Sequence, residues 1–262
     1  MAAAAQRPKL LAVVGPTASG KSELAMRLAK EFDGEIICAD SRTIYRGMDI
    51  GTAKPTAAEQ KQVPHWGLDL VEPGKTYSAA KFKKYAKSTI LDIQNRGKLP
   101  ILVGGTGLYI DALLYDYPFS QPGSERDPLN PRHLKKTTNL KDKRLPPGVL
   151  LVGLMPPDEV IKKRIASRAQ AMFGQGIVPE TKELIDNYGQ AAVASTAGIV
   201  YKIIIRVISG EITEQEAIEL FKTADWQYAR RQKTWFKRNE HIKWFNTPNH
   251  AYIVVKKQLL NT

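Results

Sequence analysis

The sequence predicts an α/β protein in which helices flank a parallel sheet. Short apolar runs alternate with segments of helical spacing from residue 10 to residue 173, which is typical of parallel strands joined by crossover helices. Strand patterns become rare after about residue 179, so residues 179–240 are expected to be mainly helical. The 262 residues, 43% of them apolar, suffice for one substantial core. We therefore expect one domain over residues 1–262.

Five apolar runs predict the strands of this sheet. The first, residues 10–14, is stopped by Gly15, which suits a strand buried on both faces. The other strands are predicted at residues 35–39, 100–103, 149–154 and 241–245. Helical spacing of apolar residues predicts helices over residues 23–30, 78–94, 108–114, 158–173 and 213–238.

The chain is strongly basic, with 39 Lys and Arg against 26 Asp and Glu and a net charge of +13. Such an excess attracts polyanions, with nucleic acid first and an anionic membrane surface second, although solubility alone is a further explanation. The single cysteine, Cys38, excludes an internal disulfide and lies in an apolar run, where a buried thiol is expected. No run approaches membrane-spanning length, so we expect no membrane partner and a cytoplasmic location.

Residues 117–148 form the least globular part of the sequence. Six prolines lie there among a cluster of Lys and Arg residues, a composition typical of an irregular surface segment. We interpret it as a basic insertion. A solvated loop without a specific partner is the alternative.

A glycine-rich segment predicts a phosphate-binding loop, and with it a fold like that of the P-loop NTPases. Residues 15–22 read GPTASGKS and fit the pattern G-x-x-x-x-G-K-[ST] between a predicted strand and a predicted helix. In such a loop the backbone N–H groups point at phosphate oxygens, and the helix N-terminus adds partial positive charge. The lysine supplies a full charge, and the final hydroxyl can bind Mg²⁺. The predicted phosphate-binding residues are Gly15, Pro16, Thr17, Ala18, Ser19, Gly20, Lys21 and Ser22, with Ser22 as the metal ligand.

The loop recognises a diphosphate unit and leaves open what is attached to it. A kinase, an ATPase and a transferase that uses an alkyl diphosphate could each carry it. Asp40 follows the second predicted strand, so its carboxylate should lie at the same edge of the sheet as the loop. There it could bind Mg²⁺ through water, bind a substrate hydroxyl or accept a proton from a nucleophile. The alternative is that Asp40 only caps the following turn with Ser41.

The residues after this strand resemble one enzyme family. Residues 40–56 read DSRTIYRGMDIGTAKPT. Together with the phosphate loop they resemble the tRNA dimethylallyltransferases, whose patterns GPTASGK[ST] and YRGMDIGTAKP match residues 15–22 and 45–55 at every position. Further blocks are similar to that family at residues 63–73 (VPHWGLDLVEP), 100–114 (PILVGGTGLYIDALL) and 210–239, which include R-R-Q-K-T-W. The resemblance spans nearly the whole chain.

Three segments depart from the family pattern. Thr43 stands where the family commonly has Gln two residues after the D-S pair. The stretch between residues 114 and 151 is shorter than usual, so the helical insertion of the relatives is expected to be reduced. Residues 197–202 read AGIVYK where the family has AIGYKE.

The resemblance implies an activity and a set of residues for it. A dimethylallyl group would pass from dimethylallyl diphosphate to the exocyclic amine of the adenosine just 3′ of the anticodon in tRNA, with Mg²⁺ as cofactor and the anticodon stem-loop as partner. The implied catalytic residues are Asp40 as the base, Thr17, and Arg231, which we prefer to Arg230 as the ligand of the diphosphate. The implied tRNA contacts are Asp40, Ser41, Arg42, Thr43, Thr106 and Arg132. Residues 179–240 would serve tRNA and diphosphate binding, and we expect a monomer.

Other interpretations of these residues stay open on the sequence. Arg230 and Arg231 could belong to a solvated helix face, and Thr106 to a plain helix start. For the whole chain the rivals are a small-molecule kinase, an enzyme that prenylates AMP, and a tRNA-binding protein without activity. A kinase needs an arginine-bearing lid, for which residues 132–144 are the one candidate, and the net charge of +13 argues against AMP as the acceptor.

Overall fold

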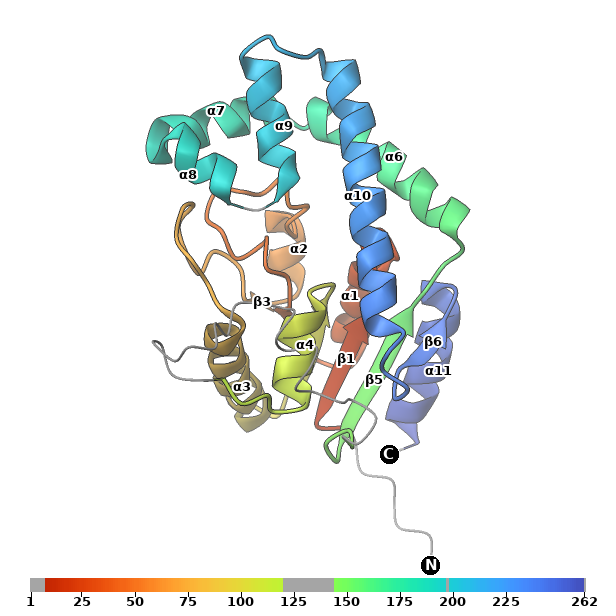
Figure 1. The fold of residues 1–262 in the computed structure, drawn as a ribbon. Helices are drawn as coiled ribbons and strands as arrows, with labels where there is room; N and C mark the ends of the chain where they lie inside the picture. The colour runs from red at the N-terminus through yellow and green to blue at the C-terminus, as the bar shows by residue number, and fades with distance from the viewer. Residues whose placement is uncertain (1–7, 120–143, 197, 262) are drawn as a thin grey trace, which may run out of the picture.

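A six-stranded sheet, parallel throughout, forms the centre of the structure (Figure 1). The computed structural model describes residues 8–119, 144–196 and 198–261. The strands follow the order β3-β2-β4-β1-β5-β6, so β1 is central. Their bounds are β1 Leu10–Val14, β2 Gly34–Cys38, β3 His65–Trp66, β4 Leu99–Gly104, β5 Val149–Leu154 and β6 Lys243–Phe245. The predicted α/β class and parallel sheet are confirmed. The sequence missed β3, which at two residues is too short to show a pattern.

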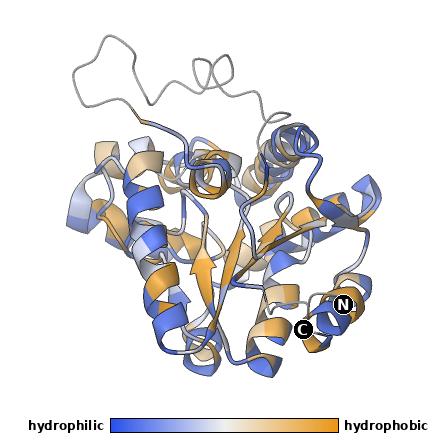
Figure 2. Cartoon of the chain, turned by 90° about the horizontal axis from the view of Figure 1, so that it is seen from below, coloured by the Kyte–Doolittle hydropathy of each residue, from blue (hydrophilic) through white to orange (hydrophobic). Residues whose placement is uncertain are grey.

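Helices cover both faces of the sheet because side chains alternate along each strand. Leu11 and Val13 of β1 pack in a core with the helices α1 and α11, while Ala12 and Val14 pack in the opposite core with α3 and α4. In Figure 2 the strands are hydrophobic and lie enclosed between helices whose outer faces are largely hydrophilic. The bounds of these helices are α1 Lys21–Glu31, α3 Ala79–Asn95, α4 Gly107–Leu114 and α11 Pro248–Leu260, with the short α2 at Ala57–Gln62. The predicted helices at α1, α3 and α4 are confirmed, with no end shifted by more than two residues.

A second group of helices has a hydrophobic core of its own, in which Tyr201 and Phe221 are fully enclosed. Their bounds are α6 Asp158–Gly174, α7 Ile177–Tyr188, α8 Gln190–Ser195, α9 Ile199–Ile208 and α10 Glu214–Phe236. The expected helical character of residues 179–240 is therefore confirmed. The long helix α10 extends from this group down to the sheet (Figure 1) and contacts both α9 and α4. Most of the predicted basic insertion, from residue 120 to residue 143, lies outside the described residues.

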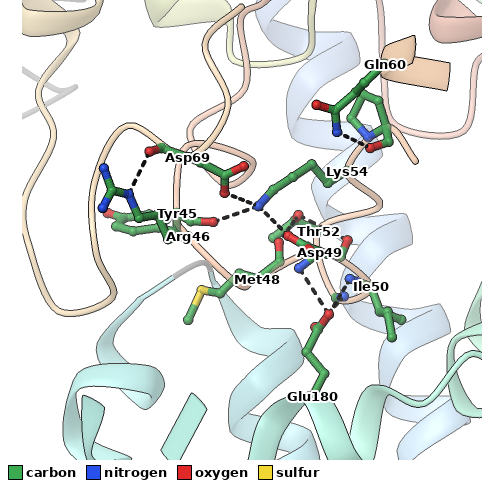
Figure 3. A network of polar contacts seen from close by, with 12 residues as sticks. Tyr45, Arg46, Met48, Asp49, Ile50, Thr52, Lys54, Gln60, Asp69 and Glu180 are labelled. Atoms are coloured by element: carbon green, nitrogen blue, oxygen red, sulfur yellow. Dashed lines mark hydrogen bonds and ion pairs between the residues drawn. The ribbon is translucent and has the colours of Figure 1, made fainter. Parts of the chain in front are cut away.

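The buried ammonium of Lys54 shapes residues 45–55, the block that has almost no regular structure (Figure 3). Lys54 is 3% exposed and donates to the carbonyl of Tyr45 at 2.9 Å, to Asp49 at 2.5 Å and to Asp69 at 2.6 Å. An ammonium has three N–H donors, so all of them are used. Lys54 thus acts as an internal anchor of the loop: its own side chain is buried, while its partners Asp49 and Asp69 stay partly exposed to solvent.

Glu180 of α7 fixes the middle of this block to the helical group (Figure 3). Its carboxylate accepts backbone N–H bonds from Asp49 at 3.1 Å, Ile50 at 2.8 Å and Gly51 at 3.3 Å. The hydroxyl of Tyr201 also donates to it at 2.8 Å. Successive amides aimed at one carboxylate stabilise the turn strongly, because hydrogen bonds to a charged group are among the strongest in proteins. Residues 45–55 therefore connect the sheet to α7, and we call this segment the bracket.

Gly51 tests how tightly this bracket is packed. A Cβ atom at Gly51 would lie 2.6 Å from Cζ of Tyr201, so Gly51→Ala must displace a fully buried ring. We expect a loss of about 1–3 kcal/mol in the free energy of unfolding, the usual cost of overpacking, measured by urea denaturation. Gly174→Ala is the matched control, since nothing lies within 4 Å of its Cβ and it belongs to α6. Equal stability of the two variants would contradict this account.

Candidate functional site

Three loops meet at the carboxyl edge of the sheet. Val14 of β1 is in register with Gly104 of β4, and Cys38 of β2 is in register with Val103. The residues that follow these strands, from Gly15, from Ala39 and from Gly105, therefore lie side by side at the edge where open α/β sheets bind ligands. This is the position predicted for the phosphate loop and for Asp40.

The phosphate loop has the conformation that its glycines allow. Gly15 has φ +144°, and a Cβ there would lie 2.4 Å from the carbonyl oxygen of Leu154, so no larger residue fits. Gly20 has φ +93° and is the N-cap of α1, which begins at Lys21. The loop is thus followed at once by a helix N-terminus, whose free N–H groups and partial positive charge favour an anion.

Ser19 supplies an independent indication that the loop holds a ligand. Its residue is fully buried, it lines the cavity at the loop, and its hydroxyl has no hydrogen-bond partner among the described residues. A buried hydroxyl left unpaired costs free energy. A phosphate oxygen seated in the loop would accept this bond and remove the cost.

The ammonium of Lys21 still has N–H donors available for a ligand. Its ammonium donates to the carbonyl of Pro16 at 2.6 Å, which leaves two of its three donors for a ligand. Burial lowers the pKa of Lys21 to about 8, while Asp40 acts in the opposite direction and Arg168 lowers the pKa further. The ammonium is therefore still charged at neutral pH, and no carboxylate of the described residues forms an ion pair with it.

Gln232 of α10 ties the phosphate loop to the loop after β4. Its side-chain oxygen accepts the backbone N–H of Thr17 at 2.8 Å, and its amide nitrogen donates to the carbonyl of Gly105 at 2.9 Å. Gln232 is buried and lines the cavity. This role of Gln232, the Q of the R-R-Q-K-T-W block, was not predicted, because a neutral amide between charged residues carries no local signal of burial.

Asp40 has two roles in the structure. Its carboxylate accepts the backbone N–H of Arg42 at 2.8 Å, so it caps the turn as the alternative interpretation held. It also lines the cavity together with Lys21 and the loop, so its carboxylate is available to a ligand. Capping uses one oxygen of the carboxylate and leaves lone pairs for a second bond.

The predicted tRNA contacts after Asp40 lie together with Thr106. The backbone N–H of Ser41 donates to the hydroxyl oxygen of Thr106 at 3.0 Å, which joins the loop after β2 to the start of α4. The guanidinium of Arg42 lies over the ring of Tyr228, 4.2 Å from its centroid. Thr43 is buried and lines the cavity, and its hydroxyl has no partner among the described residues.

These loops enclose one cavity of about 290 Å³. The phosphate loop and Lys21 form one wall, and Asp40 and Thr43 stand beside it. Residues 52–55 of the bracket form a further wall with His65. A phosphate held by the loop would therefore lie in the same enclosure as a carboxylate that can accept a proton.

Two predicted residues lie elsewhere. Arg230 and Arg231 are exposed on α10 and do not line the cavity, and the guanidinium of Arg231 is 5.7 Å from the ring centroid of Tyr228. Their predicted roles are left as predictions. Arg132 lies outside the described residues. The cavity instead includes Arg168 of α6, for which the sequence offered no motif.

The donors around the loop suit Mg²⁺. Ser22 stands in the first turn of α1 and lines the cavity with Asp40, so a hydroxyl and a carboxylate, both oxygen donors, face the same space. Among the described residues no three His, Cys, Asp or Glu side chains cluster as a self-contained metal site. Mg²⁺ is commonly held by one or two protein oxygens together with substrate phosphates, so the residues present fit it.

The fold and the site together define a P-loop α/β protein whose phosphate loop shares its cavity with a carboxylate.

No helix in the described ranges combines the length and the hydrophobicity that a membrane crossing would need.

Comparison with known proteins assigns the family. The model of the IPP transferase family matches residues 43–144 and 129–239. A tRNA dimethylallyltransferase of Pelotomaculum thermopropionicum is 35% identical over 292 residues, covering 94% of this chain and 93% of the relative. The crystal structure of a tRNA isopentenylpyrophosphate transferase from Staphylococcus epidermidis superposes with a TM-score of 0.78 at 34% identity, covering 97% and 99% of the two chains. The chain belongs to the IPP transferase family, which confirms the predicted resemblance.

A more distant structure shares the fold. A eukaryotic dimethylallyltransferase, crystallised while acting on tRNA, matches with a TM-score of 0.75 at 23% identity, covering 95% of this chain and 76% of that one. The P-loop arrangement of sheet and helices is thus kept where most of the sequence has changed.

Binding of an alkyl diphosphate should weaken as the pH rises above about 8. The pKa of Lys21 is lowered to about 8, so its charge is lost as the pH rises through that value, whereas phosphate esters complete their second ionisation near pH 6. The dissociation constant should increase by up to about tenfold per pH unit beyond the pKa. Calorimetric titrations with an unreactive alkyl diphosphate would measure it. Lys21→Ala should bind weakly without this rise, and a pH-independent constant in the unmodified chain would contradict the role of Lys21.

Proposed function

We propose that this chain transfers a dimethylallyl group from dimethylallyl diphosphate to the exocyclic amine of the adenosine just 3′ of the anticodon in tRNA. The products are N-isopentenyladenosine in tRNA and diphosphate. The observation that carries the proposal is the single cavity that presents the phosphate loop and Asp40 together. Membership of the IPP transferase family supports the same chemistry, because the similar proteins are named tRNA dimethylallyltransferases.

The phosphate loop stabilises the leaving group in this reaction. As the carbon–oxygen bond breaks, negative charge grows on the departing diphosphate, and fixed N–H donors and cations lower the energy of that state. Thr17 stands in the loop with its backbone position set by Gln232, and Lys21 keeps two N–H donors free. Arg231, with Arg230 as the alternative, would add an arginine from α10 once both substrates are bound.

Asp40 serves as the general base. The adenine amine is a poor nucleophile because its lone pair is delocalised into the ring, so it must lose a proton as it attacks. A carboxylate in the cavity, held in place by the N–H of Arg42, can accept that proton. The hydroxyl of Thr43, buried without a partner, offers a further hydrogen bond to the base edge.

Ser22 and Asp40 are the residues that would serve a Mg²⁺ ion bound with the diphosphate. The hydroxyl of Ser22 would hold the ion directly, Asp40 would take part through water, and the ion would supply positive charge that offsets the charge of the phosphates. Binding and orientation of the substrate by the loop and proton transfer at Asp40 are the contributions of the chain itself.

The chain binds tRNA mainly through the phosphates of the RNA. The net charge of +13 gives the chain a strong, sequence-independent attraction to RNA, and an adenosine in an anticodon loop must be unstacked before it can enter a cavity. Ser41, which is hydrogen-bonded to Thr106, and Arg42 follow Asp40 directly in the chain, and with Thr43 they would contact the extruded nucleotide, with Arg132 contributing from the basic insertion. We assign residues 1–262 to one catalytic domain that acts as a monomer, with residues 117–148 as the insertion and residues 179–240 as the tRNA- and diphosphate-binding part.

An acceptor assay separates this function from its rivals. The protein is incubated with labelled dimethylallyl diphosphate and Mg²⁺, together with total tRNA or with AMP, and a parallel reaction offers ATP and candidate alcohols. We expect label to enter tRNA alone, because the cavity joins a phosphate loop to a base within a strongly basic chain. Label in AMP would support the AMP-prenylating alternative, and phosphorylation of an alcohol would support the kinase.

Asp40→Asn tests the role of Asp40 as a base separately from its role in capping the turn. The amide oxygen can still accept the N–H of Arg42, so the loop should keep its shape while the group loses its basicity. The rate of transfer should fall by about 10²- to 10⁴-fold with tRNA affinity within about threefold of the original. Single-turnover kinetics and a filter-binding assay measure the two effects. Asp186→Asn, an exposed carboxylate on α7, is the matched control. Loss of affinity with normal turnover per complex would remove Asp40 from this role.

A further inference from the structure

Tyr228 of α10 lies near the carboxylate of Asp40 and has no part in the mechanism above. Asp225, Tyr228 and Gln232 follow one another at helical spacing, so they share one face of α10. Gln232 on this face lines the cavity. Burial, with the negative charge of Asp40 as a smaller contribution, raises the pKa of Tyr228 to about 12. Tyr228 is therefore a neutral phenol at neutral pH, close enough to Asp40 for that charge to act on it.

The ring of Tyr228 holds the side chain of Arg42. The guanidinium carbon of Arg42 lies 4.2 Å from the ring centroid, which is the geometry of a cation–π contact. The carboxylate of Asp225 lies 4.0 Å from the same guanidinium, and a Cβ atom at Gly198 would lie 3.1 Å from it. The side chain of Arg42 is accordingly only 20% exposed. Arg42 is thus packed against α10 and the start of α9.

The backbone of Arg42 in turn holds Asp40. The N–H of Arg42 donates to a carboxylate oxygen of Asp40 at 2.8 Å. Residues 41–44 form a turn outside the helices and strands, so no ladder of backbone hydrogen bonds fixes this N–H. The hydrogen bond can orient the carboxylate only if Arg42 itself is fixed, and the packing of its side chain against α10 does this.

Thr106 fixes the same turn one residue earlier. The backbone N–H of Ser41 donates to the hydroxyl oxygen of Thr106 at 3.0 Å. The hydroxyl of Tyr228 forms a hydrogen bond with the side chain of Thr106, which acts to lower the pKa of the phenol against the larger effect of burial. Tyr228 therefore contacts Arg42 with its ring and Thr106 with its hydroxyl, and these are the two groups that hold the turn after Asp40.

We propose that Tyr228 is a positioning residue for the base: it fixes Arg42 and Thr106, and through them the turn that orients the carboxylate of Asp40 in the cavity. The inference rests on the proposed function for the reaction that Asp40 serves, and on geometry for the role of Tyr228. Tyr228 is not among the residues that line the cavity, so it acts on orientation and not by contact with the substrates. Orientation matters because a misplacement of about 1 Å can cost about 10²-fold in rate.

Two substitutions separate the ring from the hydroxyl. With both substrates saturating, Tyr228→Leu should lower the single-turnover rate of transfer by about 30- to 100-fold, because the turn after Asp40 loses both contacts. Tyr228→Phe keeps the ring under Arg42 and loses one hydrogen bond, so its rate should fall by only about 2- to 10-fold. Gln227→Leu is the matched control, since it places the same side chain at the adjacent, exposed position of α10. Its rate should stay within about twofold.

A double variant distinguishes the positioning of Asp40 from a general weakening of the fold. Once Asp40→Asn has removed the base, a residue that acts through Asp40 has little left to affect. Tyr228→Leu in that background should therefore lower the rate by less than about threefold more. A merely structural defect would multiply the two losses. If Tyr228→Leu fails to fold, Tyr228→Met replaces it with the same expected results, because a flexible thioether fills the space without a ring.

Hydrogen exchange gives a measurement that does not depend on transfer. In the chain without substrates, Tyr228→Leu should speed amide exchange in the peptide that covers residues 40–44 by about tenfold, the scale of losing a cation–π contact. Gln227→Leu should leave it unchanged. Inorganic diphosphate with Mg²⁺, titrated by calorimetry, should bind all these variants within about twofold of the unmodified chain, because the phosphate loop is not altered.

The two proposals fail in different ways. If the unmodified chain transfers nothing to tRNA, the proposed function is wrong, while faster exchange of residues 40–44 in Tyr228→Leu still supports the role of Tyr228 in fixing the turn. The inference about Tyr228 is overturned if the folded Tyr228→Leu variant exchanges these residues as slowly as Gln227→Leu does. It is equally overturned if the rate losses of Tyr228→Leu and Asp40→Asn multiply.

Discussion

The site depends on the two hydrogen bonds of the Gln232 amide. One fixes the backbone of Thr17 in the phosphate loop, and the other fixes the carbonyl of Gly105 after β4. Neither loop belongs to a helix or strand at that point, so nothing in the sheet itself sets the distance between them. A buried amide that donates to one loop and accepts from the other holds both, because leaving either bond unmade inside the protein would cost free energy. Ligand binding at this edge thus begins from loops already in place.

The helix α10, which carries Gln232, connects the second group of helices to the elements around the sheet. Its buried stripe is apolar at Phe221 and Ala229 but polar at Asp225 and Gln232. The apolar residues pack in the helical group and against α6. Of the polar ones, Gln232 lines the cavity and Asp225 pairs with Arg168, which lines it. Polar groups in a buried stripe weaken simple packing, so their presence marks where α10 serves the site. The same helix therefore stabilises the fold and positions groups at the cavity.

The block at residues 45–55 has a different part in the site. It matches the family pattern at every position, and several of its contacts are internal: the buried ammonium of Lys54 pairs with Asp49 and Asp69, and backbone amides of the block face Glu180. Only its last residues line the cavity. Such a block can be specific to a family because a buried ammonium must keep acceptors for its N–H groups, which limits the substitutions that its partners tolerate.

Much of the architecture and part of the site could be predicted from the sequence, since they depend on local patterns. Apolar runs ending in Gly15 and in Asp40 predicted strands whose ends carry a phosphate loop and a carboxylate, and the structure has both at one edge. Helical spacing predicted α10 within two residues. Charge and the matched blocks indicated an RNA partner and the family. These features can be predicted because the period of a strand or helix and the geometry of a glycine loop are properties of neighbouring residues.

The tertiary structure alone decided which distant side chains complete the site. Arg168 and Asp225 are separated by 57 residues and meet only because α6 packs on α10. In the sequence Gln232 is one polar residue beside two arginines, and only the structure shows that it is buried against the phosphate loop. Arg230 and Arg231, the charged residues of the motif, lie exposed. Sequence spacing shows which face of a helix a residue shares, but the partner of that face is set by packing between elements, which no local pattern records.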